Sequence, residues 1–195
     1  MNKFCKKIML LTTIAMLCSS IGNHTAFAYT VPETIHIGLS NIGSAITLSN
    51  KSINVGAEEN GTYISGGIVK SDKGFTFSSG NGTYGAISLY YDSYEAAKQN
   101  AATIANSFPA YTGGGKWQIY VSGMTGEQIK QKMGLPAENV PSVSNMILVQ
   151  SGGKTMFITN IITPQFGAAD NDTGVITING KEYRGKIQPT RVNGG

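Results

Sequence analysis

The sequence is divided into short alternating stretches by glycine and asparagine residues. Within each stretch an apolar residue alternates with a polar one, which is the two-residue period of a strand with one buried face. Glycine and asparagine between the stretches supply turns, and the 195 residues include 25 glycines. The pattern predicts a β-rich α+β protein built from antiparallel strands and hairpins. The expected strands cover residues 34–39, 45–48, 53–55, 63–69, 75–77, 146–149, 155–162, 175–178 and 182–187.

Two of the turns are specific enough to predict hairpins. Asn179-Gly180 separates two alternating stretches, and this dipeptide favours the turn that joins adjacent antiparallel strands. A pair of glycines at 152–153 lies between two further stretches in the same way. Residues 78–85 are expected to form a flexible loop and a boundary, and residues 164–172 a second loop.

A small α+β unit is expected at residues 88–124. Asp92 is a suitable N-cap for a helix, and Glu95 stands three residues later, where a capping-box acid belongs. A helix is predicted over residues 93–108 because one face is apolar at helical spacing, and Pro109 disfavours its continuation. Its apolar residues are Tyr94, Ala97, Ala101, Ile104, Ala105 and Phe108.

A returning strand and a second helix are expected next. Glycines at 113–115 predict a turn, and Trp117 begins an alternating strand with one buried face. Thr125 and Gln128 have the spacing of a second capping box. Gly134 is expected to end the short helix that follows them.

The first 28 residues have the composition of a secretory signal. Three lysines precede an apolar run at 8–18, and Ala-Phe-Ala at 26–28 is a cleavage sequence. The run is too short to cross a bilayer comfortably, and a retained membrane anchor is the alternative. The exported chain is expected to begin at Tyr29, to be secreted and associated with the cell wall, and to meet a membrane only through an uncleaved signal.

Removal of the signal changes the composition. Cys5, Cys18 and His24 lie within it, together with three of the 15 basic residues and none of the 11 acidic ones. The net charge therefore falls from +4 to about +1, which gives no electrostatic basis for nucleic-acid binding. The exported chain retains one histidine, His36, and no thiol, which argues against a zinc site or a Cys–His nucleophile. No cofactor is expected.

The central unit resembles the SPOR-like modules of bacterial cell-wall proteins. Those modules have an aromatic strand, a Ser-x-x-x-Ala helix and a strand that begins with tryptophan and ends in glycine. The matching residues are Tyr90 and Tyr91, Ser93 to Ala97, and the strand at 117–123. The resemblance implies a small βαβ unit that contacts glycan strands.

A second resemblance is to the SpoIID/LytB domain (stage II sporulation protein D-like). Tyr183-Arg184-Gly185 and the Ile-His-Ile-Gly-Leu sequence at 35–39 are similar to segments of that domain, and a SPOR-like insertion is found between these segments in some members. The implied organisation is a signal peptide at 1–28, an N-terminal β-rich part at 29–85, a SPOR-like unit at 86–150 and the start of the SpoIID core at 151–195.

The catalytic segment of that family is not matched. Family members continue into a Glu-x-Tyr-Leu segment that carries an essential glutamate of peptidoglycan lytic transglycosylases, and the resemblance carries no catalytic residue over to these 195 residues. It implies a truncated or split member without enzyme activity of its own. The alternatives are a gene fragment, the N-terminal part of an active transglycosylase, and a non-enzymatic modulator of a cell-wall amidase.

The acidic residues give weak signals for catalysis or metal binding. Glu58 and Glu59 are expected in a solvated polar turn, and Glu182 on a strand as the exposed cross-strand partner of a lysine or threonine. Residues 170–174 resemble half of a calcium loop but lack its third acid and distal glutamate. His36 is expected to face solvent. No catalytic or metal-binding residue is therefore predicted.

Binding of sugars is the better-supported activity. Aromatic rings offer flat surfaces that match the apolar faces of sugar rings, and aromatic residues, Tyr90 among them, gather around the central unit. The expected partners are peptidoglycan glycan strands and other cell-wall hydrolases. Packing in the core is the alternative for each of these rings. The candidate glycan-binding residues are Trp117, Tyr111, Tyr120 and Tyr94.

Overall fold

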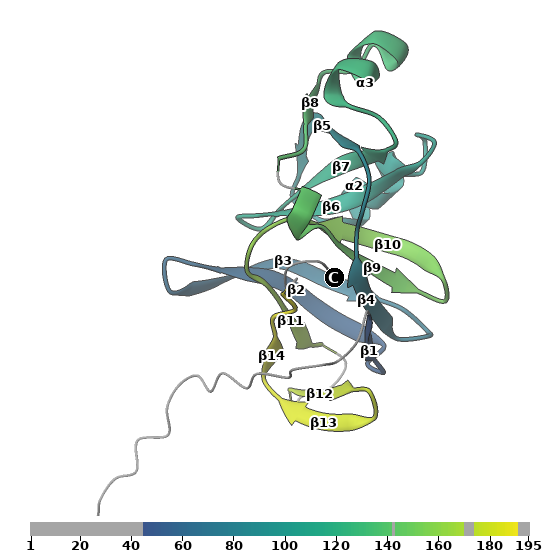
Figure 1. The fold of residues 1–195 in the computed structure, drawn as a ribbon. Coiled ribbons are helices and arrows are strands. Elements are labelled where there is room, and N and C mark those ends of the chain that lie inside the picture. The colour runs from purple at the N-terminus through teal and green to yellow at the C-terminus, as the bar shows by residue number, and fades with distance from the viewer. Residues whose placement is uncertain (1–44, 142, 170–173, 191–195) are drawn as a thin grey trace, which may run out of the picture. The chain divides into compact units, whose positions relative to one another are not determined.

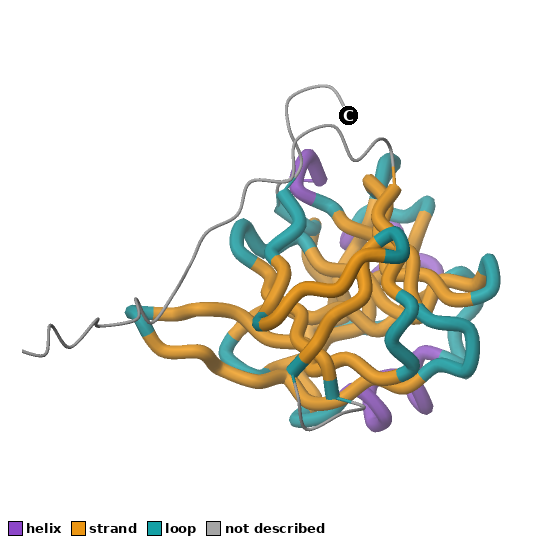
Figure 2. The backbone as a smooth tube through the Cα atoms, turned by 90° about the horizontal axis from the view of Figure 1, so that it is seen from below, coloured by secondary structure: helices purple, strands orange, loops and turns teal. Residues whose placement is uncertain are grey.

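The alternating stretches form strands in two sheets (Figures 1 and 2). The computed structural model describes residues 45–141, 143–169 and 174–190, so the expected signal, the strand at 34–39 and His36 lie outside the described residues. The β-rich α+β class is confirmed. The strands are β1 (Ala45–Leu48), β2 (Ser52–Glu59), β3 (Thr62–Lys70), β4 (Phe75–Ser79), β5 (Tyr84–Tyr91), β6 (Ser107–Gly113), β7 (Lys116–Ser122), β8 (Ala137–Asn139), β9 (Ile147–Ser151), β10 (Lys154–Thr159), β11 (Pro164–Ala168), β12 (Val175–Ile178), β13 (Lys181–Arg184) and β14 (Lys186–Ile187).

The larger sheet has the order β13-β12-β1-β4-β9-β10-β6-β7-β5-β8, and the smaller one the order β14-β11-β2-β3. In Figure 1 the larger sheet can be followed from the β12–β13 hairpin at the bottom to β8 at the top. Among the described strands every pairing is antiparallel except that of β10 with β6. Both predicted hairpins are confirmed, and Asn179 at the tip of one has a left-handed φ of 48°.

Several predicted strand boundaries are wrong, and two of these errors change the sheet topology. Residues 164–168, expected in a loop, form β11 and pair with β2, because a proline is tolerated at the first position of a strand and Phe166 is buried. The strand expected at 182–187 is divided at Gly185, whose φ of 106° redirects the chain. As a result β13 stays in the larger sheet and β14 joins the smaller one.

The first helix, α2 (Tyr94–Ala101), is shorter than predicted. Its N-cap is Ser93, whose hydroxyl accepts a hydrogen bond from the amide of Ala96, whereas Asp92 forms an ion pair with Lys116. Residues 107 and 108, expected at the end of the helix, belong to β6, as does Pro109. This segment pairs with β7 instead of continuing the helix, so tertiary contacts override the local apolar spacing.

The second helix, α3 (Gly126–Met133), is confirmed with its predicted ends. The hydroxyl of Thr125 accepts a hydrogen bond from the amide of Gln128, and the Gln128 side chain accepts one from the amide of Thr125. Gly134 closes the helix in the left-handed conformation, with a φ of 68°. The local sequence therefore determines both ends of this helix.

Residues 84–139 follow the order β5-α2-β6-β7-α3-β8, and their four strands lie in the order β6-β7-β5-β8. This is the split βαβ arrangement with two helices, two strands and one helix more than the βαβ unit expected from sequence. Its edge strand β6 pairs with β10, so the unit shares a continuous sheet with the scaffold. The expected boundaries at residues 85 and 150 fall inside β5 and β9.

Buried aromatic rings join this unit to the scaffold. Trp117 on β7 is fully buried, and its ring centroid lies 5.3 Å from those of Tyr94 and Tyr111 and 5.4 Å from that of Phe157 on β10. The indole nitrogen of Trp117 donates a hydrogen bond of 2.7 Å to the carbonyl oxygen of Gly66 on β3. One side chain therefore links strands of both sheets.

Candidate functional site

The split βαβ unit has one face covered by its helices and one face free of them. Ala101 of α2 and Ile129 of α3 pack against Ile87, Ile119 and Val121. Side chains directly opposite one another on paired strands point to the same side. The register places Tyr120 and Glu138 on either side of Ala86, and Gln118 opposite Ala110, on the helix-free face.

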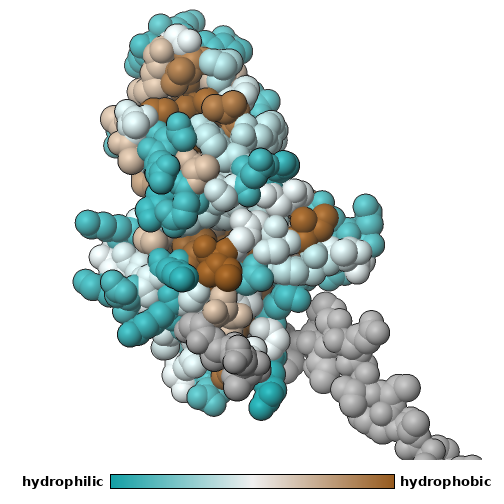
Figure 3. Space-filling view, turned by 180° about the vertical axis from the view of Figure 1, so that it is seen from behind, coloured by the Kyte–Doolittle hydropathy of each residue, from teal (hydrophilic) through white to brown (hydrophobic). Residues whose placement is uncertain are grey.

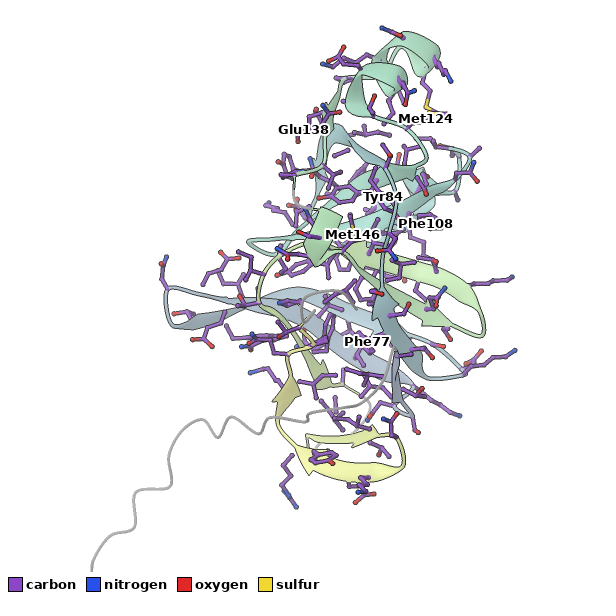
Figure 4. The ribbon with its side chains drawn as sticks, viewed as in Figure 1. Phe77, Tyr84, Phe108, Met124, Glu138 and Met146 are labelled. Carbon is purple, nitrogen blue, oxygen red and sulfur yellow. The ribbon has the colours of Figure 1, made fainter. Side chains whose placement is uncertain are left out.

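Part of this helix-free face is covered by the connection from β8 to β9. Val140 and Met146 from that connection pack with Tyr84, Phe108 and Tyr120. Figure 4 shows Tyr84, Met146 and Phe108 close together, with Glu138 further along on β8. The uncovered part is an open groove of about 410 Å³. Its lining residues are Ala86, Tyr90, Thr112, Gln118, Tyr120, Glu138, Asn139, Pro141, Asn160 and Ile161.

A bulge in β5 shapes one side of this groove. Ile87 pairs with Ile119 and Tyr91 with Trp117, so three residues of β5 stand opposite a single residue of β7. Bulges of this kind redirect side chains at the edges of sheets and beside sites. Here the bulge leaves Leu89 and Tyr90 exposed, at 52% and 60%, and Tyr90 lines the groove.

Leu89 and Tyr90 are adjacent in the sequence, and both are large apolar residues exposed to solvent. Figure 3 shows apolar side chains on the rear face as separate patches among polar ones. Single exposed apolar residues are normal on a soluble surface. A pair on one bulge beside a groove is a more specific feature. The exposed large apolar residues of the described chain are Ile68, Leu89, Tyr90 and Ile162.

Hydrogen bonds fix the polar side chains of the groove. The Nε2 of Gln118 donates to Oε1 of Glu138 at 3.4 Å. The hydroxyl of Tyr120 donates to Oδ1 of Asn160 at 3.0 Å, and Nδ2 of Asn160 donates to the carbonyl oxygen of Pro141 at 2.9 Å. The groove is therefore lined by amides, a carboxylate and a phenol. These groups come from β7, β8 and the segment after β10.

The Tyr120 phenol is a hydrogen-bond donor at all physiological pH values. Burial raises the pKa of Tyr120 to about 12, and the nearby Tyr90 and Glu138 act in the same direction. The phenolate is disfavoured because it would be charged in a poorly solvated position beside a carboxylate. The hydroxyl therefore remains protonated and holds Asn160 in its orientation.

The structure places three of the four candidate glycan-binding residues in the core. Trp117 and Tyr111 have no exposed surface and Tyr94 is 2% exposed. The rings of Tyr94 and Tyr111 each pack at a tilt against that of Trp117, and the Tyr111 hydroxyl donates to the carbonyl of Ile64. Such burial leaves no ring face for a sugar, so these three residues are removed from the candidate site. Tyr120 does line the groove, although it is only 3% exposed.

Strand β7 was expected to have one buried face, but both of its faces are buried. Gln118 and Tyr120, expected to be polar and outward-facing, are each 3% exposed. The reason is that β7 is a central strand, with helices on one side and the β8–β9 connection on the other. The groove residues that sequence reasoning missed are Gln118, Glu138 and Asn160. The run Leu89-Tyr90-Tyr91, which breaks the alternation, was the available signal for the bulge.

The other residues considered from sequence lie elsewhere. Tyr183 and Arg184 belong to β13, and β13 and β8 are opposite edges of the larger sheet. Glu182 is exposed and paired with Thr177, as predicted. Glu58 and Glu59 lie in β2 rather than in a turn, where they accept hydrogen bonds from Gln165 and from the amide of Gly114.

Among the described residues there is neither a metal-binding cluster nor a membrane-spanning helix. They contain no cluster of three or more histidine, cysteine, aspartate or glutamate side chains that could hold a metal ion. None of their helices has both the length and the apolar character needed to cross a membrane. The half calcium loop expected at 170–174 falls mainly outside the described residues.

Comparison of the chain with protein families, with curated proteins and with solved structures found no match.

Proposed function

We propose that this is a secreted, cell-wall-associated SpoIID/LytB-like protein that binds peptidoglycan glycan strands in the groove on its helix-free face. The observation that supports the proposal is the exposed Tyr90 ring beside the amide of Gln118 and the carboxylate of Glu138. Sugar rings have apolar C–H faces and a rim of hydroxyl and amide groups. An exposed aromatic ring next to fixed hydrogen-bonding groups suits both parts of such a ligand.

The form of the groove also suits a polymer. Small-molecule sites occupy roughly 300–1,000 Å³ and enclose most of the ligand. This groove has a volume of about 410 Å³ and lies open on the surface of a sheet. An open groove of this size can hold part of a glycan while the rest of the strand continues on either side.

Replacement of Tyr90 by alanine is the direct test. We expect the exported chain to sediment with purified peptidoglycan glycan strands, and Tyr90→Ala to weaken this binding about three- to tenfold, the range of a lost aromatic contact of ~0.5–1.5 kcal/mol. The matched control is Leu89→Ala, because Leu89 is on the same bulge and similarly exposed but does not line the groove. Equal binding by Tyr90→Ala and the unchanged protein would show that the groove is not the glycan site.

We further propose that residues 29–195 bind glycan without cleaving it. Cleavage needs a carboxylic acid against the scissile oxygen with its proton retained near neutral pH. Glu138 is the one carboxylate among the lining residues, and it is exposed to water. A zymogram with peptidoglycan is expected to show no clearing by this chain. Clearing that disappears in Glu138→Gln would contradict this and identify the acid.

A further inference from the structure

One carboxylate lines the groove, and a second lies near one of its lining residues. Glu138 lines it on β8. Glu59, at the end of β2, does not line the groove but lies near Ile161, which does. A Cβ placed on Gly113 would lie 3.1 Å from Glu59 Oε1 and 3.9 Å from the Cγ2 methyl of Ile161, a lining residue.

No positive side chain balances these two carboxylates within the described ranges. The ion pairs there join Lys98 with Glu95, Lys116 with Asp92, and Lys130 with Glu127. The hydrogen-bond donors to Glu138 and Glu59 are neutral, a glutamine amide and a backbone N–H. The lining residues include no lysine, arginine or histidine.

Tyr90 attracts positive charge, as the Glu138 carboxylate does. The face of a tyrosine ring attracts cations through its quadrupole, and Tyr90, which is 60% exposed, lines the groove together with Glu138. Gln118, 3% exposed, orients the Glu138 carboxylate from below. The groove has a carboxylate and no positive side chain among its described lining residues, so it attracts a positively charged ligand.

We infer that the groove prefers glycans with free amino groups, that is glucosamine units, over fully N-acetylated ones; this inference rests on the proposed function. A protonated sugar amine pairs with the Glu138 carboxylate and lies near the Tyr90 ring. Acetylation of the amine removes the charge and leaves a single N–H donor. The acetylated sugar still stacks on the ring, so it binds, but less tightly.

The experiment compares two oligosaccharides of equal length, β-1,4-linked glucosamine and β-1,4-linked N-acetylglucosamine. Titration calorimetry on residues 29–195 is done at a pH where the amines are protonated and the carboxylates ionised. We expect the amine form to bind about three- to fivefold tighter, the scale of an exposed ion pair. The difference should shrink as salt is added, because salt screens exposed charges.

Two variants separate this inference from its alternatives. Glu138→Gln keeps the shape of the side chain but removes its charge, and should bring the affinities for the two sugars to the same value. Glu182→Gln removes an exposed carboxylate from β13, at the opposite edge of the sheet, and should leave the preference unchanged. A preference that survives in Glu138→Gln overturns the inference.

The wild-type result distinguishes the two proposals. Binding of the acetylated sugar with equal or greater affinity overturns the inference and leaves the proposed function standing. Binding of neither sugar overturns both. Thermal unfolding of each variant at the wild-type temperature shows that the fold is intact, which we expect because both carboxylates are exposed.

Discussion

Replacement of Trp117 by alanine is expected to bring the protein close to complete unfolding. The side chain has no exposed surface and contacts Tyr94, Tyr111 and Phe157. Truncating a buried tryptophan to alanine costs about 3–5 kcal/mol through lost transfer free energy and the cavity left behind. The carbonyl of Gly66 also loses its hydrogen-bond donor, at a cost of about 1–3 kcal/mol. The summed cost is comparable to the whole free energy of unfolding of a typical domain, about 5–15 kcal/mol.

The measurement is denaturant unfolding followed by far-ultraviolet circular dichroism, since the variant lacks the only tryptophan of the chain. Trp117→Phe is the matched control. It keeps an aromatic ring but loses the indole N–H, so we expect a smaller loss of stability. A wild-type midpoint for Trp117→Ala would mean that the aromatic cluster does not hold the split βαβ unit to the scaffold.

Replacement of Gly126 by valine is expected to displace α3 and β8 and to damage the groove with them. A Cβ on Gly126 would lie 2.4 Å from the carbonyl carbon of Glu138, which is backbone and cannot rotate away. The amide of Gly126 also donates a hydrogen bond of 2.9 Å to Oδ1 of Asn139, a lining residue. Overpacking of this kind costs about 1–3 kcal/mol, and more where backbone must move.

Stability and glycan binding are measured together for this variant. Gln131→Val is the control, because Gln131 is exposed on the same helix and carries the same β-branched penalty without the clash. We expect Gln131→Val to remain near wild type in both measurements. In Gly126→Val binding should fall even in the fraction that stays folded. Wild-type binding by folded Gly126→Val would show that the position of β8 does not matter to the site.

Local signals were sufficient wherever one residue type determined one backbone conformation. Asn179-Gly180 produced its hairpin, and Thr125, Gln128 and Gly134 produced α3 with both ends as expected. These features depend on hydrogen bonds and torsion angles within a few residues. They were predictable because these torsion angles and capping bonds form within the segment itself, and the hydrogen bonds between Asn179 and Thr47 of β1 do not oppose the turn.

The first helix shows where local signals fail. Residues 93–108 have helical apolar spacing, yet the chain leaves the helix after Ala101 and Asn106 adopts a φ of 56°. The hydroxyl of Ser107 donates to the carbonyls of Ala101 and Ile104, and β6 then pairs with β7. The partner strand, β7, follows β6 after a turn. The apolar spacing within residues 93–108 therefore could not predict this pairing.

The candidate site was the least predictable part. Aromatic content indicated the region in which the groove lies, but it could not separate Trp117, buried among rings of the scaffold, from Tyr90, turned outward by a bulge. Gln118, Glu138 and Asn160 come from β7, β8 and the segment after β10. No spacing in the chain connects three residues whose strands become neighbours only when the sheet forms.

The sequence by itself determined that this chain forms short strands joined by tight turns, because side-chain alternation and positive-φ residues act locally. Only the tertiary structure decided which faces of those strands remain open to solvent. That outcome depends on the order of strands in the larger sheet and on which side the two helices pack, and both arise from contacts between distant segments. A groove on one sheet face is therefore a property of the assembled fold, although every residue in it can be read in the sequence.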